Sequence, residues 1–120
     1  MNRKEAVGKF GEEIARDFLV KKGYEIINCN LKLSYKEIDI IAKRGDFLVF
    51  VEVKTRSSSL FGTAADALGS IKIGRFKKAA GHYLGLFKGL DFKKVRLDFI
   101  AVDLNKETKL AKIKHFIDIV

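Results

Sequence analysis

The sequence predicts an α/β sandwich in which helices cover a central mixed sheet. Apolar residues recur at helical spacing in two long segments, residues 3–22 and 71–87. Strand-like apolar runs lie between these segments and after the second one. The resulting order, αβββαββ, is typical of a domain that packs helices against a sheet.

Residues 3–22 are expected to form the first helix. Val7, Phe10 and Ile14 place apolar side chains on one side of it, at three- and four-residue steps. Gly23 follows a pair of lysines, and glycine commonly closes a helix because it adopts a left-handed backbone without a steric cost. We therefore place the end of this helix just before Gly23.

One stripe of this helix carries small residues. Gly8, Gly11 and Ala15 follow one another at three- and four-residue steps. A glycine inside a helix costs about 1 kcal/mol relative to alanine, and a close approach of the helix to the sheet would offset that cost. Such an approach would bring Glu12 towards the strands. The alternative is that Glu12 is a solvated acid stabilised by the helix dipole.

Three strands are expected next, over residues 24–33, 36–42 and 47–54. A turn at Lys43-Arg44-Gly45-Asp46 joins the second strand to the third as a hairpin. Consecutive strands joined by a short turn run antiparallel, so we expect these strands to be neighbours in one sheet.

The second half of the chain supplies one helix and two strands. Ser70 is expected to cap a helix of residues 71–87, and Gly89 helps to end it. Strands are expected over residues 95–102 and 112–120, with a turn between them. These elements complete the order αβββαββ.

The hairpin strands carry charged residues where a buried sheet would favour apolar ones. Asp39 lies in the first of these strands, and Glu52 and Lys54 lie in the second. Successive side chains of a strand point to opposite faces, so Glu52 and Lys54 share one face. If Asp39 joins them, two carboxylates and a lysine can hold a hard divalent cation and polarise a phosphate.

The length of the hairpin loop decides whether Asp39 meets these two residues. A two-residue loop, Arg44-Gly45, would set Asp39 opposite Phe50 and diagonal to Glu52. A four-residue loop would set Asp39 directly opposite Glu52. Both registers keep the carboxylates on one face, whereas a three-residue loop would put them on opposite faces.

The composition bounds what the chain can do. Its 120 residues suit one domain, 1–120, with a real core, and no apolar run is long enough to cross a membrane. Cys29 is the single cysteine, so no internal disulfide is possible. The first residues lead into an amphipathic pattern and not into a signal sequence. We expect a cytoplasmic protein that does not contact membranes.

The charge of the chain is strongly positive. The formal net charge is +9, from 24 basic and 15 acidic residues. The excess is concentrated between Ser70 and Arg96, where Asp91 is the single acid. Such a segment suits the phosphate backbone of a nucleic acid. The alternative is a soluble basic surface that binds nothing.

Several short motifs occur in an order that resembles a known family. They are Gly8-x-x-Gly11-Glu12-x-x-Ala15, Gly23-Tyr24, Asn30, Glu37-Ile38-Asp39-Ile40-Ile41-Ala42, Phe50-Val51-Glu52-Val53-Lys54-x-Arg56, Phe61-Gly62, Lys72 and Arg96-Leu97-Asp98. This ordered set resembles the small bacterial YraN-like family of predicted endonucleases, which is related to archaeal Holliday junction resolvases. The similarity covers nearly the whole chain.

The resemblance implies a restriction-endonuclease-like three-layer sandwich of the PD-(D/E)XK superfamily. It implies that Asp39 and Glu52 bind Mg²⁺, or Mn²⁺, and that Lys54 helps to activate or position the attacking water. Glu12 matches an acidic residue that completes the site in the resolvases, as a further catalytic residue and metal ligand. Lys36 stands where the family usually has glycine, and we expect the metal ligands to be unaffected by it.

The implied activity is that of a Mg²⁺-dependent endonuclease that hydrolyses phosphodiester bonds of branched or junction DNA. A two-fold homodimer is the expected assembly on such DNA. Arg56, Lys72, Arg75 and Lys78 are the candidate contacts to DNA phosphates. The alternative is a non-cleaving nucleic-acid-binding module that retains the nuclease fold.

Overall fold

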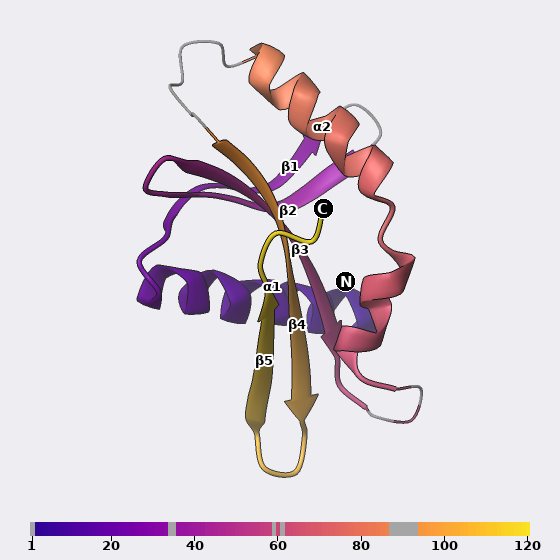
Figure 1. Cartoon of the computed structure of the whole chain (residues 1–120). Coiled ribbons are helices and arrows are strands. Elements are labelled where there is room, and N and C mark those ends of the chain that lie inside the picture. Colours follow the sequence, from indigo (N-terminus) through magenta and orange to yellow (C-terminus); the bar gives the residue numbers. More distant parts are fainter. Residues whose placement is uncertain (1, 34–35, 59, 61, 87–93) are drawn as a thin grey trace.

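The computed structural model describes the chain except for residues 1, 34–35, 59, 61 and 87–93. Its elements follow the expected order, with one short helix added after the third strand (Figure 1). Their bounds are α1 Arg3–Lys21, β1 Glu25–Leu33, β2 Lys36–Arg44, β3 Phe47–Arg56, the 3₁₀ helix η1 Ala64–Ser70, α2 Ile73–Leu86, β4 Lys94–Asn105 and β5 Leu110–Phe116.

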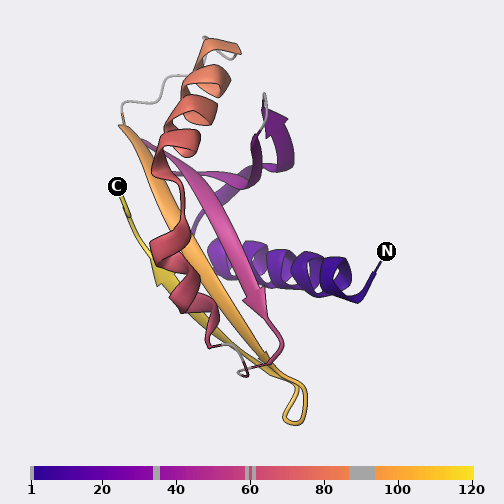
Figure 2. The same ribbon diagram turned by 90° about the vertical axis from the view of Figure 1, so that its right-hand side faces the viewer.

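Among the described residues, five strands form one sheet in the order β1-β2-β3-β4-β5. Neighbours pair antiparallel except for β3 and β4, which run parallel. A parallel pair needs a crossover connection. Here η1 and α2 provide it on one face of the sheet, while α1 lies on the other face (Figure 2). The predicted three-layer sandwich with a mixed central sheet is confirmed.

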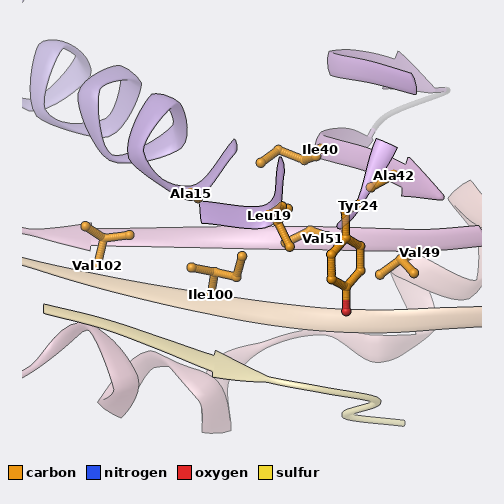
Figure 3. Packing of buried hydrophobic residues seen from close by; sticks show 9 residues of the cluster. All are labelled: Ala15, Leu19, Tyr24, Ile40, Ala42, Val49, Val51, Ile100 and Val102. Carbon is orange, nitrogen blue, oxygen red and sulfur yellow. The ribbon is translucent and has the colours of Figure 1, made fainter. Parts of the chain in front are cut away.

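Each face of the sheet has its own apolar core. Under α1, Ala15 and Leu19 of the helix pack against Val51, Ile100 and Val102 of the strands (Figure 3). Burying one such aliphatic side chain contributes about 1.5–3 kcal/mol. This core holds α1 against the middle of the sheet.

The second core lies under α2. Leu48 and Phe50 of β3 pack against Phe76, Ala79 and Tyr83 of the helix. The rings of Phe50 and Tyr83 meet edge to face, with centroids 5.6 Å apart. Because Leu48 and Phe50 alternate with the β3 residues that face α1, the two cores lie on opposite sides of the same strand.

The small residues of α1 bring this helix onto β3 at one point. Gly11 is buried, and a Cβ added to it would overlap the side chain of Thr55. Gly8 has open space around it, so the predicted close approach occurs at Gly11 and not at Gly8. Glu12 follows Gly11 directly, and this contact therefore fixes its height above the sheet.

The loop of the β2–β3 hairpin has two residues and lies one residue later than Arg44-Gly45, the two-residue alternative that we considered. Arg44 pairs with Phe47, which leaves Gly45-Asp46 as the loop. Gly45 has a φ of 58°, and a left-handed first loop residue is what type II′ hairpin turns require. The resulting register directs Asp39 towards Glu52, as the four-residue loop would have done.

The crossover between β3 and β4 starts differently from the prediction. Ser70 ends η1 and does not cap α2, because its Oγ donates to the backbone oxygen of Ala67 at 2.8 Å. The second helix begins only at Ile73. Its expected end at Gly89 lies outside the described residues. No helix in the described part of the chain is long and apolar enough to cross a membrane.

A buried carboxylate ends β5 earlier than the predicted residue 120. Asp98 is 0% exposed and accepts hydrogen bonds from Arg96 Nε and Nη2 and from the backbone N of Asp118, each at 2.9 Å. His115 Nε2 lies 2.7 Å from its Oδ2. Burial alone would raise the pKa of Asp98, but these hydrogen bonds outweigh it and lower the pKa. The bond to Asp118 turns the chain inward, so β5 stops at Phe116.

We expect Gly11→Ala to destabilise the fold by about 1–3 kcal/mol, the usual cost of overpacking a filled core. The added methyl group would meet Thr55 Cβ as well as its Oγ1, so rotation of Thr55 alone cannot remove the overlap. Gly8→Ala is the matched control, because nothing lies within 4 Å of a Cβ added there. Its greater helix propensity should raise stability by up to about 1 kcal/mol.

Urea unfolding of the two variants measures both differences. A Gly11→Ala variant that is as stable as Gly8→Ala would contradict the close contact between α1 and β3.

Candidate functional site

Asp39 lies where the ladder between β2 and β3 ends. The last backbone pair of this ladder is Ile40 with Val51. Beyond it, the backbone N of Val53 donates to Asp39 Oδ2 at 2.8 Å. Backbone N–H groups point along the sheet towards the neighbouring strand. The Asp39 carboxylate therefore lies at the level of the sheet, between the two strands.

This break in pairing has its cause in β1 and β2. Ile38 and Ile41 pack in the same core, although residues three apart in a regular strand point to opposite faces. Regular alternation, on which the prediction relied, therefore does not hold at Asp39. Asn30 of β1 has a φ of 52°. The irregularity at these positions lets the β1–β2 hairpin fold towards α2, where Leu33 joins the core under that helix.

Glu52 and Lys54 lie on the η1 face of β3, as their alternation predicts. Both line a groove of about 360 Å³ that η1 and the start of α2 border, which we call the site groove. Its basic residues are Lys36, Lys54, Arg56, Lys72 and Arg75. Glu52 is the acidic residue that accompanies them in this lining. A carboxylate beside a basic wall suits an anion that binds together with a cation.

Lys36 forms an ion pair with Glu52. Lys36 Nζ lies 3.2 Å from Glu52 Oε2 and 4.6 Å from the centroid of the Phe76 ring. The two charged side chains are 23% and 25% exposed, and such partly exposed pairs contribute about 0.2–1 kcal/mol. The expectation that Lys36 leaves the carboxylates unaffected is wrong, because its ammonium group occupies an oxygen of one of them.

Glu12 reaches the region from α1. Its Oε1 accepts a hydrogen bond from Asn30 Nδ2 at 2.5 Å, and the same nitrogen donates to Glu37 Oε1 at 3.2 Å. Glu12, Asn30 and Asp39 also line a small groove of about 160 Å³ on the α1 side of the sheet. Asn30 thus holds Glu12 in place beside Asp39, which a freely solvated acid would not require.

The surroundings of Asp39 disfavour its charge. Burial raises the pKa of Asp39 from 3.8 to about 7, helped by the negative charge of Glu52 and, less strongly, of Glu12. The hydrogen bond from Val53 and the positive charge of Lys36 act in the opposite direction. Both other carboxylates are therefore close enough to influence Asp39. A positive charge added near Asp39 would stabilise the ionised form of its carboxylate near neutral pH.

This donor set suits a hard divalent cation. No group of three or more His, Cys, Asp or Glu side chains that could hold a metal ion occurs among the residues that the structure describes. Mg²⁺ does not need such a cage, because it keeps several waters and is held by one or two carboxylates together with substrate phosphates. Asp39 and Glu52 are two such carboxylates, but they line different grooves: Glu52 lines the site groove, and Asp39 lines the small groove on the α1 side together with Glu12.

Three of the four candidate phosphate contacts share the site groove, namely Arg56, Lys72 and Arg75. Lys78 is exposed on α2 and does not line the groove. Arg56 also lines a groove of about 590 Å³ beside the start of α1, which we call the α1 groove. Its Nε is buried without a hydrogen-bond partner in the described part of the chain. Such a group costs about 1–3 kcal/mol, which an oxygen of a bound anion would recover.

Comparison with known proteins identifies the family. The sequence matches the uncharacterised protein family UPF0102 over residues 11–102. The chain belongs to this family. A UPF0102 protein of Dictyoglomus thermophilum is 42% identical over 98% of this chain and 98% of its own. One of Flavobacterium psychrophilum is 46% identical over 93% of this chain and 91% of its own.

A solved structure to which this chain is similar is that of an fdxN element excision controlling factor protein from Anabaena variabilis. It has a TM-score of 0.43 and 17% identity, and the match covers 88% of this chain and 97% of that one. The family resemblance seen in the motifs is confirmed at the level of UPF0102 membership.

Sequence reasoning named Asn30 and Lys36 but did not foresee their contacts in this UPF0102 site. Asn30 carried a signal, since asparagine within a strand pattern tolerates a positive φ and has a side chain that bonds in two directions. Lys36 carried a weaker one, because only the fold of the β1–β2 hairpin brings its ammonium group to Glu52.

Asp39→Asn should stabilise the protein at about pH 8 and above. Between pH 3.8 and about 7, Asp39 is protonated in the folded chain and ionised in the unfolded chain. Unfolding therefore releases a proton, and stability falls as the pH rises through this window. The raised pKa corresponds to a loss of at most about 4 kcal/mol above the window. Asparagine stays neutral, and its Oδ1 can still accept from Val53 N.

Thermal unfolding in metal-free buffer at about pH 4 and about pH 8 measures this difference. We expect the Tm of Asp39→Asn to exceed that of the wild type at the higher pH and to match it at the lower pH. Asp17→Asn, at an exposed position of α1, removes the same charge and is the control. Equal Tm values at the higher pH would contradict the described surroundings of Asp39.

Proposed function

We propose that this chain is a metal-dependent endonuclease that hydrolyses DNA phosphodiester bonds and selects branched or junction DNA. One observation carries the proposal. Glu52, which interacts with Asp39, shares a groove with Lys54 and with four further basic side chains. Carboxylates that suit a divalent cation thus lie next to cations that suit a phosphate, and phosphodiester hydrolysis needs both.

Asp39 and Glu52 are the proposed ligands of Mg²⁺ or Mn²⁺, with Glu12 as the additional acid. The chemistry supplied by such a cation is polarisation of a phosphate oxygen and activation of a water. Asp39 binds in its ionised form, so it gives up its proton when the site is loaded. The raised pKa of Asp39 supports this assignment, because perturbed carboxyl groups are concentrated at functional sites.

The basic residues have two tasks in this proposal. Lys54 positions the attacking water or stabilises the negative charge that develops on the phosphate. Arg56, Lys72 and Arg75 hold the backbone phosphates beside the one that is cleaved. Arg56 is the best placed of the three, since its buried Nε lacks a partner that a phosphate oxygen would provide.

Selection of branched DNA would rest on shape. The proposed contacts are to phosphates, which carry no sequence information of their own. Recognition then depends on how the backbone is arranged and how easily it deforms. Two chains related by a two-fold axis would present two such sites, which is the arrangement that paired cuts across a junction require.

The second candidate function is a nucleic-acid-binding module that does not cleave. The ion pair between Lys36 and Glu52 favours it, because an ammonium group 3.2 Å from a carboxylate oxygen competes with any metal for that oxygen. In this alternative the site groove still binds phosphates, and its carboxylates only orient the basic side chains.

Incubation with branched, flapped and linear DNA in Mg²⁺ or Mn²⁺ separates the two functions. For the nuclease, we expect Asp39→Ala and Glu52→Ala to reduce cleavage to background, because each removes a ligand carboxylate. Lys54→Ala should reduce it about 10²–10³-fold, as loss of one group that stabilises the transition state does. Glu25→Ala, at an exposed position in β1, is the matched control and should cleave like the wild type.

Salt-dependent binding without cleavage by the wild type would support the module and contradict the nuclease. Cleavage that survives both Asp39→Ala and Glu52→Ala would show that the reaction occurs at another site.

Divalent cations should stabilise the folded protein. A ligand that binds only the folded state adds about 1.4 kcal/mol when its concentration is ten times its Kd. We therefore expect Mg²⁺ or Mn²⁺ to raise the Tm of the wild type at about pH 8, and to raise that of Glu52→Gln less. NaCl of matched ionic strength is the control. Equal shifts in the two proteins would indicate a general salt effect and would contradict a metal site at Glu52.

A further inference from the structure

We propose that the β4–β5 hairpin is a second phosphate-binding surface, which holds a duplex arm of the DNA up to about 20 Å from Glu52. The proposal rests on the proposed function for its ligand, because a nucleic acid is the polyanion that both surfaces would share. The DNA contacts expected from the sequence are on α2 and next to it. The β4–β5 hairpin is a different part of the molecule, and it projects from the sheet beyond the helices (Figure 1).

The strand registers put lysines of the hairpin on the face of the candidate site. Lys54 of β3 is level with Ala101 of β4, which pairs with Lys114 of β5. Residues paired across strands point to the same face, so Lys114 shares the face of Lys54. Two residues further along β3, Arg56 is level with Asp103 of β4, which pairs with Lys112 of β5, so Lys112 shares the face of Arg56.

Arg56, Lys112 and Lys114 line a groove of about 950 Å³ between the hairpin and the loop after β3, which we call the hairpin groove. Its basic residues are Arg56, Lys106, Lys112 and Lys114. Its acids are Asp103 and Glu107, and Asp103 Oδ1 already accepts a hydrogen bond from the backbone N of Ala64 at 2.8 Å. The hairpin groove therefore has an excess of positive charge.

The three lysines of the hairpin groove are free to bind an anion. Lys106, Lys112 and Lys114 are exposed. Within the described ranges of the chain, none of them takes part in an ion pair. Exposed, unpaired lysines on one surface attract a phosphate backbone without reading its sequence.

Arg56 connects the hairpin groove with the candidate site. It lines the site groove, the hairpin groove and the α1 groove. Lys106 lines the last two of these, and the α1 groove adds Arg3 and Lys4. A basic path therefore leads from the site to the hairpin, and it is longer than the site groove alone.

The length of β4 sets how far this path reaches. Phe99 is level with Glu52, and Asn105 ends the strand six residues later. At about 3.3 Å per residue, the tip of the hairpin lies about 20 Å along the strand from Glu52. This distance corresponds to about six base pairs at 3.4 Å each. Lys114 and Lys112 are level with Ala101 and Asp103, two and four residues beyond Phe99. A shorter duplex arm would therefore contact these two lysines but would not reach Lys106 at the tip.

The test compares DNA arms of two lengths. Binding is measured in EDTA, which prevents metal-dependent cleavage, on two branched DNAs with loop-closed arms of about 5 or about 15 base pairs. The test variant is Lys106→Gln/Lys112→Gln/Lys114→Gln. The control variant, Lys21→Gln/Lys22→Gln/Lys43→Gln, removes the same charge from exposed positions that line none of the three grooves.

We expect the test variant to bind the long-armed DNA about tenfold more weakly than the control variant. For the test variant, the slope of log affinity against log salt concentration should be shallower than that of the control variant by about 2.7, as the loss of three phosphate contacts predicts. On the short-armed DNA the difference should be smaller, with a salt slope shallower by about 1.8, because an arm of about 17 Å reaches Lys112 and Lys114 but not Lys106. Lys112→Gln alone should reduce the salt slope by about 0.9, which checks the result in a chain with a single exposed change.

Equal binding of the long-armed DNA by the two variants, or an equal loss on both arm lengths, overturns the hairpin proposal and leaves the nuclease proposal intact. The expected binding pattern without cleavage of either DNA in Mg²⁺ supports the hairpin surface and overturns the nuclease. Failure of the wild type to bind either DNA overturns both.

Discussion

The parallel pairing of β3 with β4 is the constraint on which the rest of the structure depends. From Phe47 beside Lys94 to Arg56 beside Asp103, the two strands run in the same direction. The chain that leaves β3 must therefore cross back over one face of the sheet before β4 can begin. η1 and α2 make that crossing over the face that carries Glu52, and α1 covers the other face. The two cores and the basic wall of the site groove follow from this single pairing.

Asp39 departs from the regular sheet that this pairing organises. The backbone N–H of Val53 bonds to a side chain at the position where a strand partner would be expected. This bond fixes the Asp39 carboxylate close to Glu12 and Glu52, whose charges help to raise its pKa. A neutral side chain would serve stability better there. The arrangement is therefore more typical of a functional site than of a core.

Local periodicity decided how much could be predicted from the sequence. The face of Glu52 and Lys54 was predictable, because β3 pairs with β4 without a register shift through both residues. The position of Asp39 was not, because it depends on an irregularity near Asn30 that changes no apolar pattern. Ser70 was assigned to the wrong helix end, because a serine hydroxyl bonds to backbone groups at either end of a helix and the sequence does not distinguish them.

Lys36 gives the site an internal counter-ion. Its ammonium group contacts both Glu52 and the ring of Phe76, and its charge acts against the rise in the pKa of Asp39. Repulsion among the carboxylates is thus partly neutralised by the chain itself. The chain can therefore hold β2 and β3 together through its own charges. In the proposed metal-dependent nuclease, assembly of the site and its loading with a cation would be separate events, linked by exchange of Lys36 for the cation.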